Sequence, residues 1–378
     1  MNIGFNTFRV SESAGGIENT GYILTEALAE KNDIFVTVFS DKSSVVPEKC
    51  ISVKSAYNYT SFFKLIYDIY KRIKDYSRDN RLDFNLCGIY YYALGSYLQR
   101  KHNGTPYGIM LHGNELITPN SNHINIVKKI KRAFLYKYRR TILENADILF
   151  CNSQYTMELC RSQFNCKNII VVNPPIKIKH AVYKNGKKPT YKILSLGRIV
   201  ERKGFQYVIK AMSDINRYNS SIKYYIAGTG PYEEELVNIA KQCHVEKNVI
   251  FLGKVSEEDK NKLYAECDFF LMPSIYIEKD SSVEGFGLVY IEANMFGTYV
   301  IGTNTGGIQD AISDGINGTF VKEGSSRDIS DKIINLYSNW PSYNSKECIN
   351  WANKFDASKV ADIYCEIIEH TIQKEKAF

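Results

Sequence analysis

Several features that would place a protein in a special class are missing from this sequence of 378 residues. The nine Cys are an odd number and form no Cys-x-x-Cys pair, which argues against a disulfide framework and against a structural zinc site. No apolar run approaches the roughly 18 residues of a membrane-spanning helix. The first residues show no basic start followed by an apolar core, so we expect no secretory leader and a cytoplasmic location.

The charged residues form no long basic run, although Lys and Arg outnumber Asp and Glu by 48 to 41, which gives a net charge of +7. The lack of such a run argues against a nucleic-acid partner. The charge is uneven, since residues 1–180 carry 24 basic and 15 acidic side chains and the remainder carries 24 and 26. This difference predicts two domains with different partners.

Two motifs of cofactor-binding proteins are also absent. The first glycine-rich turn, Gly15-Gly16-Ile17-Glu18, is not Gly-x-Gly-x-x-Gly, and no acidic residue about 20 positions later completes a dinucleotide fingerprint, so NAD is disfavoured. The turn can still approach a phosphate or a sugar, which makes Gly16 a candidate binding residue. No Asp-x-Asp motif stands at a strand end, so we expect neither a metal ion nor another cofactor.

Short apolar runs alternate with helical patterns along the chain, which predicts an α/β protein with βα units on parallel sheets. The segment Asn173–Thr190 holds three Pro and five Lys without periodicity, and it is predicted to be a linker. We expect a first domain over 1–175, a linker over 176–190, a second domain over 191–350 and a C-terminal helix over 351–378. The expected strands are Met1–Asn6, Ile34–Phe39, Leu86–Tyr90, Tyr107–Leu111, Ile148–Cys151, Ile169–Val172, Lys192–Gly197, Lys223–Ala227, Val249–Leu252, Phe269–Met272 and Tyr299–Gly302.

Two cations, Arg198 and Lys203, follow the expected strand Lys192–Gly197. At the carboxyl end of a strand they suit a diphosphate, because each charge-assisted hydrogen bond contributes about 1.5–3 kcal/mol. A solvated charged loop is an equally good explanation, because half of the segment Gly-Arg-Ile-Val-Glu-Arg-Lys-Gly is charged.

Three further strand ends carry candidate residues. A glycine-rich turn begins at Gly228, and Lys254 and Val255 follow the strand after it. On local grounds an ordinary strand-to-helix turn explains the turn at Gly228, and the strand end at Lys254 and Val255 says little by itself. His112 follows the strand Tyr107–Leu111, and although an isolated His is more often structural, its place at a strand's carboxyl end favours a functional role.

The segment Pro273–Thr319 is the most informative. Glu284 precedes the run Gly-Phe-Gly-Leu-Val, after which the pattern becomes helical. A loop that enters a helix presents free backbone N–H groups to an anion. Glu292 follows eight residues later, about two turns into the expected helix, so the two carboxylates can contact different parts of one extended ligand. The alternative is a pair of Glu on a solvated helix face, and the glycine-rich strand-to-helix corner weakens that alternative.

Two helical stretches of the first half, Tyr59–Arg81 and Ile124–Arg140, are basic with interleaved aromatic residues. They are compatible with anionic lipid headgroups or with a lipid-linked or polyanionic acceptor. A domain helix with a solvated basic face is the simpler explanation for either helix alone. Together with the basic charge of the first half, they make peripheral contact with an anionic membrane a hypothesis.

The segments taken together resemble a known family, the retaining glycosyltransferases of family 4. The match runs in order from Gly197 to Val321 through LGRIVERKG, IAGTGP, FLGKV, MPS, EGFGLVYIEA and VIGTNTGGIQDAISDGINGTFV. The first half agrees through GGIE, LHG and ENADILFCNSQYT, and WANKF resembles the family's final helices. The resemblance implies the GT-B fold, in which two doubly wound Rossmann-like domains face each other across a cleft and the C-terminal helix crosses back to the first domain.

The resemblance also implies roles by position. Arg198 and Lys203 match cations on the donor diphosphate, Glu284 matches a contact to the donor sugar's hydroxyls, and His112 matches a position beside the reacting sugar. Glu292 matches a contact to the nucleotide ribose. The other positions matched to donor binding are Gly16, Gly228, Lys254, Val255, Phe286, Gly287, Leu288 and Val289.

The implied function is transfer of a hexosyl group from a nucleoside diphosphate sugar, with UDP-glucose as the first guess, to a hydroxyl of a glycan or lipid-linked acceptor. The resemblance implies a retained anomeric configuration, independence from metal and a role in polysaccharide or other glycan biosynthesis. A nucleotide-sugar epimerase on the same fold, a phosphorylase with a pyridoxal-binding Lys and a non-catalytic basic binding protein are the alternatives.

Overall fold

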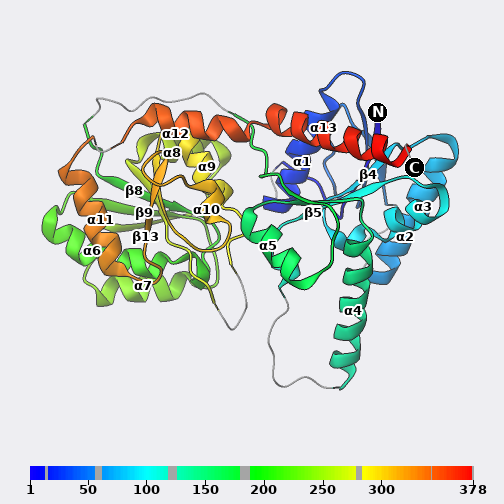
Figure 1. The fold of residues 1–378 in the computed structure, drawn as a ribbon. Coiled ribbons are helices and arrows are strands. Elements are labelled where there is room, and N and C mark those ends of the chain that lie inside the picture. The colour runs from blue at the N-terminus through cyan, green and yellow to red at the C-terminus, as the bar shows by residue number, and fades with distance from the viewer. Residues whose placement is uncertain are drawn as a thin grey trace. The chain divides into compact units, whose positions relative to one another are not determined.

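A computed structural model describes residues 1–12, 16–55, 62–117, 126–178, 188–277, 283–341 and 343–376. The chain divides into two compact units (Figure 1). Unit 1 comprises Met1–Lys177 and Asp356–Phe378, and unit 2 comprises Ile178–Phe355. The predicted linker lies partly outside the described residues, which stop at 178 and resume at 188.

Unit 1 contains a seven-stranded parallel sheet of order β3-β2-β1-β4-β5-β6-β7. Its central strands are buried along their whole length, which explains why they stand in the sequence as continuous apolar runs. The strands are β1 (Asn2–Asn6), β2 (Phe35–Ser40), β3 (Ile51–Lys54), β4 (Phe84–Cys87), β5 (Tyr107–Leu111), β6 (Ile148–Cys151) and β7 (Ile169–Val171).

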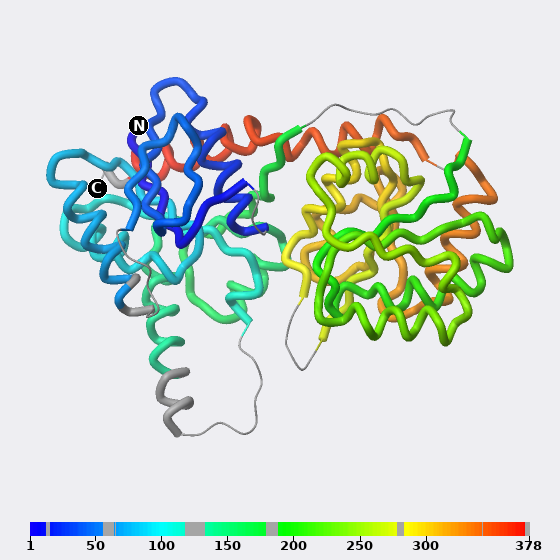
Figure 2. The backbone as a smooth tube through the Cα atoms, turned by 180° about the vertical axis from the view of Figure 1, so that it is seen from behind, coloured from blue at the N-terminus to red at the C-terminus, as the bar shows by residue number. Residues whose placement is uncertain are grey.

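Helices cover both faces of this sheet. On one face α13 lies beside α1, as Figures 1 and 2 both show, and the two helices bury Leu24, Leu28, Tyr364 and Ile368 against the strands. The other face packs on a second apolar cluster that includes Ile142 of α4. The helices of unit 1 are α1 (Gly16–Ala29), α2 (Phe62–Asp79), α3 (Leu94–Asn103), α4 (Ile126–Glu144), α5 (Gln154–Gln163) and α13 (Ala357–Lys376).

Unit 2 repeats this architecture with a six-stranded parallel sheet of order β10-β9-β8-β11-β12-β13. Helices α6, α7 and α11 pack together, and α9 packs against α8 and α12 (Figure 1). The strands are β8 (Lys192–Leu196), β9 (Lys223–Ala227), β10 (Val249–Gly253), β11 (Phe269–Met272), β12 (Tyr299–Thr303) and β13 (Gly318–Val321). The helices are α6 (Phe205–Tyr218), α7 (Glu233–Gln242), α8 (Glu257–Glu266), α9 (Leu288–Met295), α10 (Ile308–Ala311), α11 (Ser326–Ser338) and α12 (Ser345–Ala352).

The chain returns to unit 1 at Asp356, five residues later than the expected boundary at 351. Trp351 belongs to α12 in unit 2, where its indole N–H donates to the carbonyl of Ala311 at 2.9 Å. Asp356 then forms a β-bridge with Ile176, and Ala357 N–H donates to the Ile176 carbonyl at 2.9 Å. The C-terminal helix expected over 351–378 therefore begins only at Ala357, and Trp351 and Ala352 belong to α12 of unit 2.

These unit boundaries change the distribution of charge. Unit 1 carries 26 basic and 20 acidic side chains, a net charge of +6, because the C-terminal helix that joins it is acidic. Unit 2 carries 22 and 21, a net charge of +1. The basic excess of unit 1 is thus smaller than the first 180 residues suggest.

The strand predictions are wrong at three places. The strand expected at Leu86–Tyr90 is β4 at Phe84–Cys87, because its register is set by pairing with β1, and Tyr90–Tyr92 forms a 3₁₀ turn. The edge strands β3 and β13 were not predicted. Strand β3 is largely exposed and β13 begins with Gly318, so neither presents the long apolar run of a central strand.

Candidate functional site

The strand order of unit 2 reverses between β8 and β11, and the loops that follow these two strands emerge at the same edge of the sheet. The two loops are packed closely. Ile275 N–H donates to the carbonyl of Arg202 at 2.7 Å, and a Cβ on Gly204 would lie 1.9 Å from the carbonyl oxygen of Pro273. Gly204 also has φ of +77°, so both its conformation and its surroundings require glycine.

A cluster of three charged side chains lies at this reversal of strand order. One carboxylate oxygen of Glu284 accepts from Lys203 Nζ at 2.6 Å and from Arg202 Nη1 at 2.9 Å. The side chains of Lys203, Glu284 and Arg202 are 10%, 16% and 23% exposed, so the contacts are only weakly screened by water. We call these three residues the switch-point cluster.

The cluster keeps Glu284 ionised. Burial alone raises the pKa of this carboxyl, but Lys203 and then Arg202 lower it, and the net pKa is about 2. At neutral pH Glu284 is therefore a hydrogen-bond acceptor and has no proton to donate. Its backbone is fixed as well, because its carbonyl accepts from Gly307 N–H at 2.9 Å, within the Gly306-Gly307 turn after β12.

Helix α9 begins just after Glu284, with Gly287 in the left-handed conformation at its N-cap. A Cβ on Gly287 would lie 2.6 Å from the ring of Tyr290, which explains the glycine. No side chain of the described residues caps this helix, so its first amides, including those of Leu288 and Val289, are suited to an anion. The Phe286 side chain is buried against Phe355, which leaves its backbone as the part that can meet a ligand.

Glu292 is the fifth residue of α9, one turn into the helix rather than the predicted two. Its carboxylate accepts from the hydroxyl of Tyr264 at 3.0 Å and lies 3.5 Å from Lys260 Nζ. Both partners come from α8. The two predicted glutamates therefore belong to the same unit but have different partners.

The remaining predicted residues of unit 2 lie in neighbouring loops. Arg198 is exposed and makes no hydrogen bond or ion pair with the described part of the chain. Gly228 is required by packing, since its Cβ would lie 1.9 Å from the carbonyl oxygen of Gly197. Gly228 N–H donates to the Gly253 carbonyl at 2.7 Å, which fixes the strand end that precedes exposed Lys254 and half-buried Val255.

The other two predicted residues, His112 and Gly16, belong to unit 1. His112 follows β5, and its Nε2 lies 2.8 Å from the carbonyl oxygen of Gly88. The His112 backbone N–H donates to the Glu115 carboxylate at 2.5 Å, which fixes the turn. Gly16 is the exposed first residue of α1, and a Cβ there would meet no atom within 4 Å.

The residue that sequence reasoning missed is Arg202. It is adjacent to Lys203 in a 3₁₀ turn that directs both cations to Glu284. A third cation is visible in the segment between Arg198 and Gly204, but its sequence position does not show that it, rather than Arg198, contacts Glu284.

Within the described ranges, no three His, Cys, Asp or Glu side chains form a group that could hold a metal ion. No described helix is long and apolar enough to cross a membrane. The predicted basic stretches lie partly outside the described side chains, which omit 56–63 and 118–132.

Comparison with known families places both units. Residues 14–180 match the family described as Glycosyltransferase Family 4, and residues 178–354 match the family described as Glycosyl transferases group 1. A GDP-mannose-dependent alpha-(1-6)-phosphatidylinositol monomannoside mannosyltransferase of Mycobacterium tuberculosis is 32% identical over 154 residues, 41% of this chain and 40% of that protein. The chain spans 36% to 40% of the length of that mannosyltransferase and of two other curated relatives.

Solved structures agree with the fold. Sucrose-phosphate synthase from Thermosynechococcus elongatus superposes with a TM-score of 0.77 at 18% identity, over 99% of both chains. HepE from Anabaena in complex with UDP-glucose superposes with a TM-score of 0.73 at 16% identity, over 98% of this chain and 100% of that one. With two parallel α/β units and family matches that together span residues 14–354, the chain belongs to the family 4 glycosyltransferases and has the GT-B fold.

Proposed function

We propose that the protein transfers a hexosyl group from a nucleoside diphosphate sugar to a hydroxyl of a glycan or lipid-linked acceptor, with retention of configuration and without a metal ion. The observation that carries the proposal is the switch-point cluster of Lys203, Arg202 and Glu284 beside the N-terminus of α9. Cations and helix amides at one sheet edge suit a diphosphate, and an ionised carboxylate among them suits the hydroxyls of the attached sugar.

The charge requirements of the reaction support this assignment. Negative charge grows on the β-phosphate as the glycosidic bond breaks, and preorganised donors at that place lower the barrier. Lys203 and Arg202 are held in position by Glu284 before any ligand arrives, so little reorganisation is needed. Exposed Arg198 in the same loop can add a third cation to the phosphates. These cations supply the charge that a divalent metal supplies in other enzymes, which is why we propose a metal-independent reaction.

The state of Glu284 bears on the mechanism. A carboxylate with a pKa of about 2 is a weak base and is not protonated at neutral pH, so it is suited to accept hydrogen bonds from the sugar rather than to transfer protons. The resemblance to the family also implies a contact between Glu284 and the hydroxyls of the donor sugar. We therefore propose that the acceptor attacks on the face of the leaving group and that the departing phosphate takes the acceptor's proton, with His112 orienting the sugar.

An epimerase is the main alternative, and the same observation weighs against it. Epimerisation needs an acid and a base at the sugar, whereas Glu284 stays ionised. Incubation of the donor sugar nucleotide without an acceptor tests this alternative, because only an epimerase would convert it to the epimer.

We propose three candidate donors, in the order in which they should be tested. UDP-glucose is first, because HepE is described in complex with it, and GDP-mannose is second, because the mycobacterial relative is named as dependent on it. UDP-GlcNAc is third. A thermal-shift screen of these donors is the direct test, since a ligand at ~100 times its dissociation constant adds about 2.7 kcal/mol to the free energy of unfolding. A screen in which no sugar nucleotide raises Tm would contradict the proposal.

A further inference from the structure

Helices α2 and α3 of unit 1 lie side by side (Figures 1 and 2). Their side chains line a groove. The helices meet at Gly95, where a Cβ would lie 2.9 Å from Ile73 Cδ1 and 3.1 Å from Tyr70 Cα. Towards the C-terminal ends of both helices they separate around a hollow of about 560 Å³. None of the residues proposed above for sugar transfer lines this α2–α3 groove.

The rims of the groove are basic. Lys74 and Arg78 line it from α2, one helical turn apart, and Lys101 and His102 line it from the last turn of α3. No lining residue is acidic. Arg78 has an exposed ion pair with Asp75 at 3.4 Å, whereas Lys74 and Lys101 pair with no carboxylate of the described residues.

The C-terminal ends of helices attract cations even without a ligand, so the negative charge of these helix ends must be subtracted from the positive charge of the groove. Each helix end is equivalent to about half a negative charge, so the two ends together offset about one unit of charge. Asp75 offsets a second unit at Arg78. Lys74 and Lys101 then remain without a carboxylate partner among the described residues, and His102 adds a further donor. The groove therefore stays attractive to an anion.

The floor and the neighbouring surface of α2 are apolar. Ile73 and Leu98 line the floor, and the polar groups beneath are satisfied, since Gln99 Nε2 donates to Ser77 Oγ at 2.7 Å. Tyr67 and Tyr70 precede Lys74 on α2 at helical spacing, with ring centroids 6.4 Å apart, and Tyr67 is 66% exposed. Tyr70 is half-buried, and an exposed tyrosine such as Tyr67 that is followed by cations is typical of a helix at a lipid–water interface.

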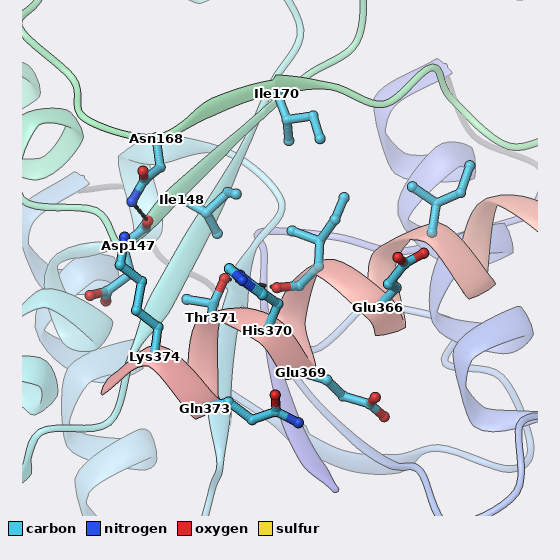
Figure 3. A pocket seen from close by; sticks show the side chains of 12 residues that line it. Asp147, Ile148, Asn168, Ile170, Glu366, Glu369, His370, Thr371, Gln373 and Lys374 are labelled. Atoms are coloured by element: carbon cyan, nitrogen blue, oxygen red, sulfur yellow. Dashed lines mark hydrogen bonds between the residues drawn. The ribbon is translucent and has the colours of Figure 1, made fainter. Parts of the chain in front are cut away.

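A second hollow of the same unit shows that the basic lining is specific to this place. It lies between α13 and the strands β6 and β7, has a volume of about 690 Å³ and is lined by Asp147, Glu366 and Glu369 (Figure 3). Lys374 and His370 line it as well, and Asp147 is paired with Arg100 at 3.0 Å, so its lining is mixed in charge rather than basic.

We propose that the α2–α3 groove binds the phosphate group and the hydrocarbon chain of an anionic phospholipid. Lys74, Arg78 and Lys101 hold the phosphate oxygens through charge-assisted hydrogen bonds, and the chain lies against Ile73, Leu98 and the tyrosines. The proposal stands independently of the sugar-transfer activity, because the switch-point cluster is in unit 2.

Lysine reactivity tests the site directly. The full chain is labelled with an amine-reactive reagent, with and without short-chain phosphatidic acid or inorganic phosphate, and labelling is quantified by mass spectrometry. We expect phosphatidic acid to reduce labelling of Lys74 and Lys101 about fivefold or more, and to leave exposed Lys241 and Lys374 unchanged. Equal protection of all four lysines would overturn the site, and equal protection by inorganic phosphate would overturn the lipid assignment.

Vesicle flotation tests the consequence for membranes. The pair Lys74→Glu and Lys101→Glu is compared with the control pair Lys241→Glu and Lys374→Glu, which changes the net charge equally. On vesicles of phosphatidylcholine with phosphatidylglycerol, we expect the groove pair to lower the partition constant about tenfold relative to the control pair. Equal partition of the two variants, or equal binding of the unchanged protein to pure phosphatidylcholine vesicles, would refute the proposal.

Discussion

The two units share one architecture but differ in the chemistry at the point where the strand order reverses. In unit 2 the loops after β8 and β11 carry Lys203, Arg202 and Glu284, three charged and largely buried side chains. In unit 1 the corresponding strands are β1 and β4. At the ends of these two strands the side chains meet neutral groups, since Asn6 Nδ2 donates to Ser96 Oγ at 3.1 Å and His112 Nε2 lies 2.8 Å from the carbonyl oxygen of Gly88. Arg9, a charged residue of the loop after β1, pairs with Asp41 after β2 at 3.5 Å and with no described residue after β4.

This difference suggests that the two units contribute differently, one by binding a charged ligand and the other by fixing positions through neutral hydrogen bonds. Burial of a charged side chain costs free energy unless the charge is paired. A cluster of buried charges such as that of unit 2 is therefore expected at a site that binds a charged ligand. A neutral network fixes backbone and side-chain positions without attracting a charged group. The comparison therefore supports the proposal that unit 2 binds the diphosphate and that unit 1 orients less charged groups.

The largest expected effect comes from Lys203→Ala. It removes the closest partner of buried Glu284, and we expect sugar transfer to fall by about 10²–10³-fold, because one preorganised donor contributes about that much. The matched control is Lys192→Ala, which removes an ion pair of 2.7 Å with Glu266 that is more exposed. Measured rates of sugar transfer for both variants test this prediction. An equal loss of activity in the two variants would contradict a special role for the switch-point cluster.

The acid stability of the protein tests the charged state of Glu284. Because its folded pKa is about 2 and below the ordinary value, Glu284 stabilises the fold above about pH 4.5, and this contribution is lost as the pH falls towards 2. About 3 kcal/mol is at stake at 1.36 kcal/mol per pKa unit. Denaturant unfolding between pH 7 and pH 3 should show a steeper loss in the unchanged protein than in Glu284→Gln. Parallel pH profiles would contradict the assignment.

Glycine substitutions sharpen the comparison of the two units. Gly204→Ala in unit 2 adds a Cβ 1.9 Å from a carbonyl oxygen at positive φ, and we expect it to cost about 2 kcal/mol of unfolding free energy. Gly16→Ala in unit 1 adds a Cβ that meets no atom within 4 Å, so Tm should stay within about 1 °C. Chemical denaturation of the two variants measures both, and a large loss in Gly16→Ala would show that the glycine has a steric role after all.

A modest effect on stability is expected from His112→Ala. The His112 ring contacts the Gly88 carbonyl at 2.8 Å, and loss of one neutral hydrogen bond costs about 1 kcal/mol. The pH dependence of stability around Glu284 should not change, because His112 belongs to the other unit. A change in that acid transition would show that the two reversal points are coupled.

The sequence predicted the central strands and the general place of the site, for physical reasons. Buried parallel strands need continuous apolar runs, so β5, β6 and β11 are visible in the sequence, whereas the exposed edge strand β3 is not. The glycine-rich turn at a strand end pointed to Gly228, although the sequence could not show that packing against Gly197 requires it.

The pairing of charges could not be predicted from spacing. Lys203 and Glu284 are 81 residues apart, and only the neighbouring positions of β8 and β11 bring them together. Arg202, which was not among the predicted site residues, is the second cation on Glu284, because the 3₁₀ turn sets its direction. Glu292 is held by Tyr264 and Lys260 of α8, a packing relation that its own helix does not contain.

The measurement that tests the central claim most directly is calorimetric titration of the donor selected by the thermal-shift screen. It compares the unchanged protein, Lys203→Ala and the control Lys192→Ala, and repeats each titration with the matching nucleoside diphosphate. The account predicts that Lys203→Ala weakens binding of both ligands at least about tenfold, while Lys192→Ala binds as the unchanged protein does. Equal affinities in all three proteins would contradict the assignment of the switch-point cluster to the diphosphate.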